Sequence, residues 1–515
     1  MSITTFIPKD ILDIPAEEFD APLFQALMEY VRLNPARFHM PGHKKGAGIP
    51  PEVAQTLRES ILAMDITETR GMDNLHSPSG CIKKAQDLAA QTFGADRTWF
   101  LTNGTTAGVH AMIMVTCKQR QKIIIPRDAH LAVIGGVILC GLRPIFVYPD
   151  IDPEWGISLG VRPEAYEEAL TEHPDAKACL ITRPNYYGIA EDLTPLVEAC
   201  RKRDIPLLVD EAHGPHIHFH EDLPPSALDY GASMVVQSTH KMLGSFTGSS
   251  MLHMKGTSSR IYPDRVQRML AILQSTSPSY LLMMSLDIAA TVMRKRGHQL
   301  MARALALSQR VRDKLKGLPG VRVLERPSMD RLKLTVSMIN LGLAGFDLKN
   351  KLIDEYNVRV ELADLENVIA FITYADTEET VDALANALTA VAREAYEKAT
   401  RHGNGLNGVK ADKHLQRGAI GTQAIFTRHL FAPAEQRLLP REATLAAHEL
   451  VSLERAEGRT CAEVVAPYPP GIPLLYPGEV IDAGKIGVID EALSLGAVFR
   501  GLNAEGDLMI TVVRE

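Results

Sequence analysis

The sequence lacks several features that would each indicate a particular class of protein. Its six cysteines form no CxxC pair and no spacing typical of a zinc site, so we expect reduced thiols in the core. The N-terminus lacks the charged-then-apolar order of a secretion signal. The longest apolar run, residues 131–142, is too short and too rich in glycine to cross a bilayer. We therefore expect a cytoplasmic protein with no membrane segment.

An excess of positive charge is also absent. The formal net charge is −7 at pH 7, which argues against nucleic acid as a partner. The sequence has no internal repeat and no low-complexity tail. Apolar residues are plentiful instead, since 46% of the 515 residues are hydrophobic. That is enough for roughly two to four domains around at least one large core.

Short apolar segments alternate with helical patterns from residue 73 onward. Helices are expected between several of these segments, for example at 107–117 and 193–203. This alternation predicts an α/β fold whose mostly parallel central sheet is covered on both faces. The expected strands are residues 98–101, 122–125, 145–148, 178–182, 206–209, 234–236 and 250–253.

Changes in composition divide the chain into five parts. We predict an N-terminal segment (1–72), a large domain (73–298), a small α/β domain (299–400), a polar glycine-rich linker (401–418) and a C-terminal domain (419–515). Helices are expected at 23–33, 299–316 and 377–392. The loop 37–51 holds two histidines and two adjacent lysines, and it is either a connection or part of a site.

The residues best suited to chemistry stand where predicted strands end, the edge at which parallel sheets bind ligands. Lys241 lies in an apolar segment, flanked by hydroxyls and a histidine in QSTHK (237–241). A buried lysine is costly unless it is neutralised, paired or used covalently, although a lysine can also extend out of a strand end into water. Asp210 lies at the mouth of strand 206–209, where a carboxylate needs a cationic partner.

Two further strand ends complete the pattern. His130 follows strand 122–125 and could stack on a flat ring or serve as a structural histidine. TNGTTAG (102–108) leads a strand into a helix, where free N–H groups and hydroxyls form either a phosphate cradle or an ordinary cap by Thr105. Together, the four strand ends match the parts of pyridoxal 5′-phosphate. They offer a cradle for its phosphate, a ring that stacks on its ring, a carboxylate for its ring nitrogen and a lysine for its aldehyde.

The chain resembles the bacterial ornithine/lysine/arginine decarboxylase family of fold-type-I pyridoxal-phosphate enzymes. It begins almost at the core of that family, so the resemblance implies the short, biosynthetic-type branch without an N-terminal wing domain. The likeness rests on HMPGHKKG (39–46), TNGTTAG (102–108), DAH (128–130), DEAHG (210–214), QSTHK (237–241), STSP (275–278) and PYPPGIPLLYPGE (467–479).

The resemblance implies decarboxylation of a basic amino acid to carbon dioxide and an amine for polyamine synthesis, with arginine favoured, then lysine, then ornithine. Lys241 would form the Schiff base, Asp210 would hold the ring nitrogen protonated, and His130 would stack on the ring. Either His240 or Lys241 would return the proton at the α-carbon. The remaining implied contacts with the cofactor are Thr105, Thr106, Ser238 and His240 around the phosphate, Ala212 and His213 beside Asp210, and Ser275.

Ser275 would reach the phosphate held by a neighbouring subunit. The resemblance therefore implies a homo-oligomer, a dimer or a dimer of dimers, with shared active sites. One departure is Gly248, where relatives usually have glutamine, and it leaves the choice of substrate less certain. Two alternatives to the decarboxylase stay open: an aminotransferase or lyase on the same fold, and a non-catalytic regulatory homologue that binds the cofactor.

Two groups of polar residues have no assigned role. Glu479 or the acidic run 361–366 could bind the distal cation of a basic substrate. The sequence HIHFH (216–220) would place His216, His218 and His220 on one face if it were a strand, which is a spacing typical of metal sites. We expect no metal there and interpret these histidines as surroundings of the site.

Overall fold

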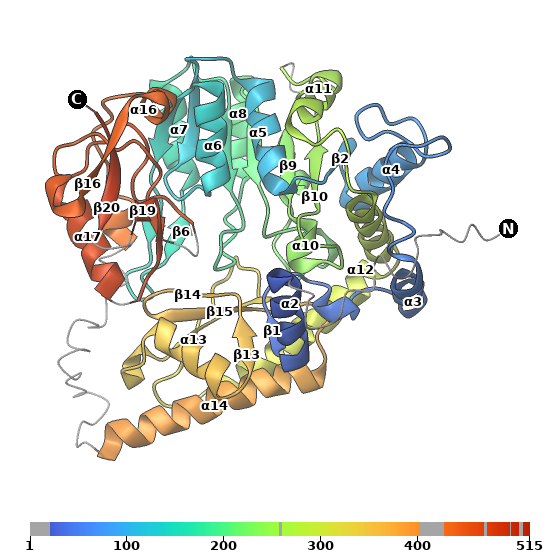
Figure 1. The fold of residues 1–515 in the computed structure, drawn as a ribbon, viewed down its shortest axis with the longest axis vertical. Helices are drawn as coiled ribbons and strands as arrows, with labels where there is room; N and C mark the ends of the chain where they lie inside the picture. The colour runs from blue at the N-terminus through green and yellow to red at the C-terminus, as the bar shows by residue number, and fades with distance from the viewer. Residues whose placement is uncertain are drawn as a thin grey trace.

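The computed structural model describes residues 21–256, 260–401, 427–467, 471–494, 496–503 and 508–514. A large domain holds the central sheet, a small domain lies below it, and the C-terminal domain lies beside the large one (Figure 1). Apart from residue 401, the expected linker falls outside the described residues.

The central sheet has seven strands in the order β2-β10-β9-β8-β7-β3-β4. β10 runs antiparallel to both of its neighbours, and the other pairs are parallel, so the predicted mostly parallel sheet is confirmed. Each expected strand is present within a few residues. The strands are β2 (Arg97–Leu101), β3 (Lys122–Pro126), β4 (Arg143–Val147), β7 (Cys179–Thr182), β8 (Leu207–Asp210), β9 (Met234–Gln237) and β10 (Ser250–Met254).

Helices cover both faces of this sheet. In β3, Ile124 packs into one apolar cluster, whereas Ile123 and Ile125 pack into another, because successive side chains point to opposite faces. The first face is covered by α4 (Cys81–Phe93), α7 (Pro163–Glu172), α8 (Thr194–Lys202) and α12 (Tyr280–Leu315), and the second by α5 (Gly104–Thr116), α6 (Leu131–Cys140) and α11 (Pro263–Leu273).

The glycines in the apolar run 131–142 have a packing role. A Cβ on Gly136 would lie 2.5 Å from the Cδ1 atom of Ile113, so a larger residue there would have to displace this side chain of α5. Among the described residues, no helix combines the length and the apolar character needed to cross a membrane.

The small domain is built on a four-stranded sheet in the order β11-β12-β15-β14. The single helix α12 runs from the large domain into the small one, and the expected domain boundary at 298/299 falls within it. The expected helix 377–392 lies within a longer helix, α14 (Glu378–Arg401). The other elements are β11 (Arg322–Val323), β12 (Lys333–Ser337), α13 (Gly345–Asp354), β14 (Leu362–Ala363), β15 (Asn367–Phe371), and the pair β1 (Ala36–Phe38) with β13 (Val358–Val360).

The C-terminal domain packs against α6, β4 and the residue that follows β3 in the large domain. It contains α16 (Pro440–Leu445), β16 (His448–Ser452), α17 (Ala483–Ser494), β19 (Leu502–Asn503) and β20 (Met509–Val513). In the motif 467–479, residues 468–470 lie outside the description. Tyr476, further along it, is buried among large-domain residues, and its hydroxyl donates to the Arg127 carbonyl at 3.0 Å.

Candidate active site

A cavity of about 400 Å³ opens at the carboxyl ends of β3, β7, β8 and β9, the edge where the sequence predicted a site. Met40, from the loop 37–51, and Glu361, from the small domain, also line it. All the residues predicted to contact the cofactor, except Ser275, line this cavity: Thr105, Thr106, His130, Asp210, Ala212, His213, Ser238, His240 and Lys241.

Lys241 lies on the short helix α10 (Thr239–Met242), which follows β9. Its Nζ lies 2.9 Å from the Nε2 of His213 and 5.6 Å from the centre of the Tyr186 ring. Burial lowers the pKa of Lys241, although the carboxylate of Asp210 opposes this shift. A lowered pKa leaves a larger share of the amine neutral, and the neutral amine is the nucleophilic form.

Asp210 is the last residue of β8 and is almost wholly buried. Its Oδ1 accepts the backbone N–H of Ala212 at 3.1 Å. Burial raises the pKa of Asp210, and the nearby Lys241 opposes that shift. A carboxylate in this position needs a cation close by to stay ionised, as the sequence analysis anticipated.

Hydroxyl groups gather where β2 leads into α5. The Thr105 hydroxyl is hydrogen-bonded to the hydroxyl of Ser238 and, at 2.9 Å, to that of Ser250. Thr106 lines the same end of the cavity. Because the first N–H groups of a helix have no acceptor within the helix, this end of the cavity suits an anion such as a phosphate.

Two of the histidines that line the cavity, His130 and His240, are held neutral at pH 7 by burial. His130 caps α6, its Nδ1 accepting the N–H of Ala132 at 3.1 Å, and burial lowers its pKa to about 4. The Nδ1–H of His240 donates to the Ser249 carbonyl at 2.7 Å, and burial lowers the pKa of His240 to about 4. His130 therefore combines the structural role and the cavity position that the sequence left as alternatives.

Two other predicted residues lie away from the cavity of their own chain. Ser275 is exposed between α11 and α12, where its carbonyl accepts from the Nε2 of His76 at 2.8 Å. Glu479 is buried and forms a two-pronged ion pair with Arg127, at 2.9 and 3.0 Å. Of the two carboxylate sources proposed for the distal cation, Glu361 of the acidic run is the one that lines the cavity.

The segment HIHFH is not a strand, the condition under which its three histidines would share a face. Ile217–Phe219 is a turn of 3-10 helix, η2, so the three histidines do not share a face. Each one has a carboxylate partner of its own because the turn directs their side chains apart: His216 with Asp330 at 3.0 Å, His218 with Asp229 at 3.0 Å, and His220 with Glu221 and Asp222 at 3.9 Å.

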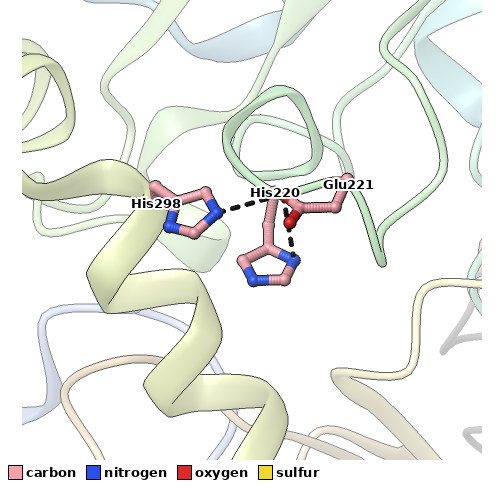
Figure 2. A group of neighbouring side chains, drawn as sticks. All are labelled: His220, Glu221 and His298. Carbon is pink, nitrogen blue, oxygen red and sulfur yellow. Dashed lines mark hydrogen bonds and ion pairs between the residues drawn. The ribbon is translucent and has the colours of Figure 1, made fainter.

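Figure 2 shows where His220 and Glu221 meet His298 of α12. The two imidazole rings are stacked, 4.6 Å apart between centres, and the Nε2 of His298 donates to Glu221 at 3.0 Å. This donor set would suit a transition-metal ion. However, the Nδ1 lone pair of His220 already accepts the N–H of Asp222 at 3.1 Å, so this nitrogen is not available to a metal ion.

The sequence analysis missed a group of cavity residues at the end of β7 and just after it. Thr182, Asn185 and Tyr186 line the cavity, and the rule that ligands gather at strand ends would have identified them. It also missed Lys333, which touches His213 from the small domain, because no local pattern marks such a contact. Gly248 has φ +90°, a conformation that favours glycine, so a glutamine there would be strained.

Comparison with known proteins agrees with this geometry. The model of the "Orn/Lys/Arg decarboxylase, major domain" family matches residues 21–333, and that of the "Orn/Lys/Arg decarboxylase, C-terminal domain" family matches residues 423–498. The chain is 40% identical over 506 residues to an arginine decarboxylase of Bacillus subtilis, spanning 97% of this chain and 99% of the relative. It is 38% identical over 502 residues to an arginine decarboxylase of Halalkalibacterium halodurans, spanning 96% of this chain and 98% of the relative.

The fold is shared with solved structures. The lysine decarboxylase of Francisella novicida superposes with a TM-score of 0.76 at 22% identity, covering 92% of this chain and 78% of that one. This likeness confirms the predicted fold-type-I architecture. Together, the family models and the identity to the Bacillus enzyme place the chain in the Orn/Lys/Arg decarboxylase family.

Proposed function

We propose that the protein is a pyridoxal-phosphate-dependent decarboxylase of a basic amino acid, with arginine the favoured substrate. The observation that carries the proposal is the convergence of Lys241, Asp210 and the hydroxyls of Thr105 and Ser238 on one cavity. Its volume of about 400 Å³ is in the usual range for a site that binds a small molecule. The similarity to two arginine decarboxylases favours arginine over lysine and ornithine.

The cavity residues fit the parts of pyridoxal 5′-phosphate. Lys241 offers an amine with a lowered pKa for the aldehyde, and the start of α5 with Thr105 offers donors for the phosphate. Asp210 is a buried carboxylate that lacks a direct ion-pair partner among the described side chains, and a protonated pyridine nitrogen would supply one. When bound, the cofactor supplies an electron sink for the bonds at the substrate α-carbon.

The side chains of the cavity would then have separate roles in the reaction. Asp210, at the end of β8, would hold a proton at the ring nitrogen by its charge, and His130, at the start of α6, would contact the ring. The proton returned to the α-carbon is assigned to Lys241 rather than His240. His240 is neutral at pH 7 and commits its Nδ1–H to the Ser249 carbonyl, whereas Lys241 faces the cavity with its amine.

Glu361 is proposed to bind the distal cation of the substrate. Its Oε2 accepts the N–H of Met40 at 2.9 Å, which directs the carboxylate beside the cavity mouth. Asp128 also lines the cavity, but it accepts the Ser158 hydroxyl at 2.7 Å and burial raises its pKa, so it is less suited to holding a charge. A charged hydrogen bond of this kind contributes about 1.5–3 kcal/mol.

The active unit is proposed to be a homo-oligomer whose sites are shared. Ser275 is exposed and does not line the candidate active-site cavity of its own chain, which suits a contact with a neighbouring subunit. The helix α2 (Pro22–Leu33) exposes Leu23, Phe24, Leu27 and Val31, each with more than half of its surface accessible. An exposed apolar face of this kind is typical of a subunit interface. A cytoplasmic location and a role in polyamine synthesis stay predictions.

The proposal is tested by carbon dioxide release from arginine, lysine and ornithine, without any keto acid in the assay. Release from at least one of them separates a decarboxylase from an aminotransferase or a non-catalytic homologue. In Glu361→Gln, kcat/KM for the preferred substrate should fall by about 10- to 150-fold, the equivalent of the charged hydrogen bond. Glu355→Gln, which changes an exposed glutamate paired with Lys351, is the control. No release from any of the three would refute the function, and an unchanged Glu361→Gln would refute the assignment of the distal site.

A further inference from the structure

A second lysine lies directly behind the candidate active site. Lys333 is the first residue of β12 in the small domain, and its side chain is fully buried. Its Nζ lies 3.3 Å from the Nδ1 of His213, 3.4 Å from the sulfur of Met242 and 3.6 Å from the centre of the Phe371 ring. Within the described part of the chain, it has no carboxylate at salt-bridge distance, and burial lowers the pKa of Lys333 to about 7.

His213 bridges the two lysines. Its Nε2 is 2.9 Å from the Nζ of Lys241, its Nδ1 faces Lys333, and its ring lies 4.3 Å from that of Tyr186. Burial keeps the pKa of His213 well below 6.5, so the imidazole is neutral. A neutral imidazole has one N–H donor and one acceptor nitrogen. Only one of the two lysines can therefore donate to it, and the other must accept its N–H as a neutral amine.

We propose that Lys333 is a positioning residue that acts through His213 to hold Lys241 as a neutral amine and to return a proton to it. With Lys333 charged, its ammonium donates to Nδ1 and the Nε2–H of His213 points at the Lys241 lone pair. When Lys333 gives its proton to Nδ1, the Nε2–H passes to Lys241. One N–H bond breaks and one forms at each side of the ring, and the net charge is unchanged.

The proposed reaction requires a proton to be supplied to Lys241. Decarboxylation replaces a carbon–carbon bond by a carbon–hydrogen bond, so each turnover consumes one proton. His213 is the hydrogen-bond partner that the structure gives the Lys241 amine. This role rests on the proposed function, whereas the control of the Lys241 charge by Lys333 does not.

Charged groups from four elements face Lys333. The carboxylates favour its charged form and the two other lysines oppose it, so its charge depends on the whole interface between the domains. These groups are Asp330 from the loop before β12, Glu361 from between β13 and β14, Lys241 from α10 and Lys44 from the loop 37–51.

The test measures the charge of Lys241 without cofactor or turnover. In the full chain freed of cofactor, trace acetylation of Lys241 as a function of pH, read by mass spectrometry of its peptide, gives the pKa of the amine. In Lys333→Met, we expect this pKa to rise by at least one unit, which makes Lys241 at least tenfold less reactive at pH 7. Without the lysine, the Nε2 of His213 can accept from a charged Lys241, which favours the ammonium form.

Lys44→Met is the matched control. Lys44 is also buried between the domains, but its Nζ contacts the Arg37 and Phe371 carbonyls and Asp376 rather than His213. The charge of Lys44 opposes that of Lys333 from a distance, but Lys44 offers no donor to the imidazole of His213, so its variant should leave the acetylation profile of Lys241 within about 0.3 unit of the wild type. If Lys333→Met does not fold, Lys333→Leu takes its place, because it too offers no donor to the Nδ1 of His213 and should shift the profile the same way.

A second measurement uses the enzyme with its cofactor bound and tests the transfer of the proton. In Lys333→Met, kcat for carbon dioxide release should fall at least tenfold while KM stays within twofold of the wild type. Superimposable acetylation profiles for Lys333→Met and the wild type would overturn the inference, and so would an equal shift in Lys44→Met. A wild-type protein that releases no carbon dioxide would refute the proposed function, whereas the acetylation profiles would still decide the role of Lys333.

Discussion

The ion pair between Arg127 and Glu479 provides the sharpest prediction about how the domains are held together. Arg127 follows β3, and Glu479 belongs to the C-terminal domain; their side chains are 1% and 3% exposed. Glu479 also accepts the N–H of Tyr476 at 2.9 Å, and the guanidinium lies 4.0 Å from the centre of the Tyr476 ring. Glu479→Gln removes the negative charge with almost no change in volume.

The size of the expected loss in free energy follows from the burial of both side chains. Removing one partner of a buried ion pair costs about 3–5 kcal/mol, because the other charge is left uncompensated. Glutamine keeps one oxygen that can still accept from Arg127, so the lower end, about 3 kcal/mol, applies. That equals about two orders of magnitude in the equilibrium between docked and open C-terminal domain, at about 1.4 kcal/mol for each factor of ten. Replacing both partners in Arg127→Leu/Glu479→Leu should recover most of this loss, because no buried charge remains unpaired.

Hydrogen exchange of the backbone amides in residues 471–481 measures this opening directly. Exchange there should accelerate by about a hundredfold in Glu479→Gln and return to within about tenfold of the wild type in the double variant. Glu442→Gln is the control, because Glu442 pairs with Arg120 across the same two domains at 3.2 Å but at the exposed surface. Exchange in Glu479→Gln within threefold of the wild type would refute the reasoning. A loss of substrate affinity without faster exchange would instead mean that Glu479 binds the distal cation.

The remaining predictions concern the site itself. Lys241→Ala should abolish turnover and the covalent attachment of the cofactor, measured by absorbance and by borohydride reduction; a reducible bond at the same peptide would contradict it. Asp210→Asn should still bind the cofactor but lose orders of magnitude in kcat, because a neutral amide cannot hold the ring nitrogen protonated; near wild-type turnover would mean that another carboxylate does so. His130→Ala should bind the cofactor more weakly in an equilibrium titration and lose less activity than Asp210→Asn, unless its ring does not contact the cofactor. Mixing Lys241→Ala with Ser275→Glu, each inactive alone, should restore part of the activity, because heterodimers hold one site with both native residues; activity that does not depend on mixing would exclude shared sites.

Much of the fold and of the candidate site could be predicted from local sequence. β3, β8 and β9 consist mostly of buried apolar residues. A strand that is covered on both faces needs apolar side chains at successive positions, so its sequence can be recognised. Lys241 and Asp210 then stand out because a charge at the end of such a run has few neighbours in the sequence that could compensate it. The conformation of HIHFH, by contrast, could not be predicted from local sequence. A short polar segment is shaped by its contacts with Asp330 and Asp229, and its own pattern does not determine its conformation.

The sequence by itself determined which residues carry chemistry and which edge of the sheet holds them, because hydrophobic periodicity and strand ends are local properties of the chain. Only the tertiary structure decided which carboxylate faces the cavity. Glu479 is 352 residues from Arg127, and this pairing removes it from the site while Glu361 stays at it. The contact between Lys333 and His213, 120 residues apart, is of the same kind. Residues so far apart in the sequence come into contact only because of how the domains pack, and no local sequence pattern predicts such a contact.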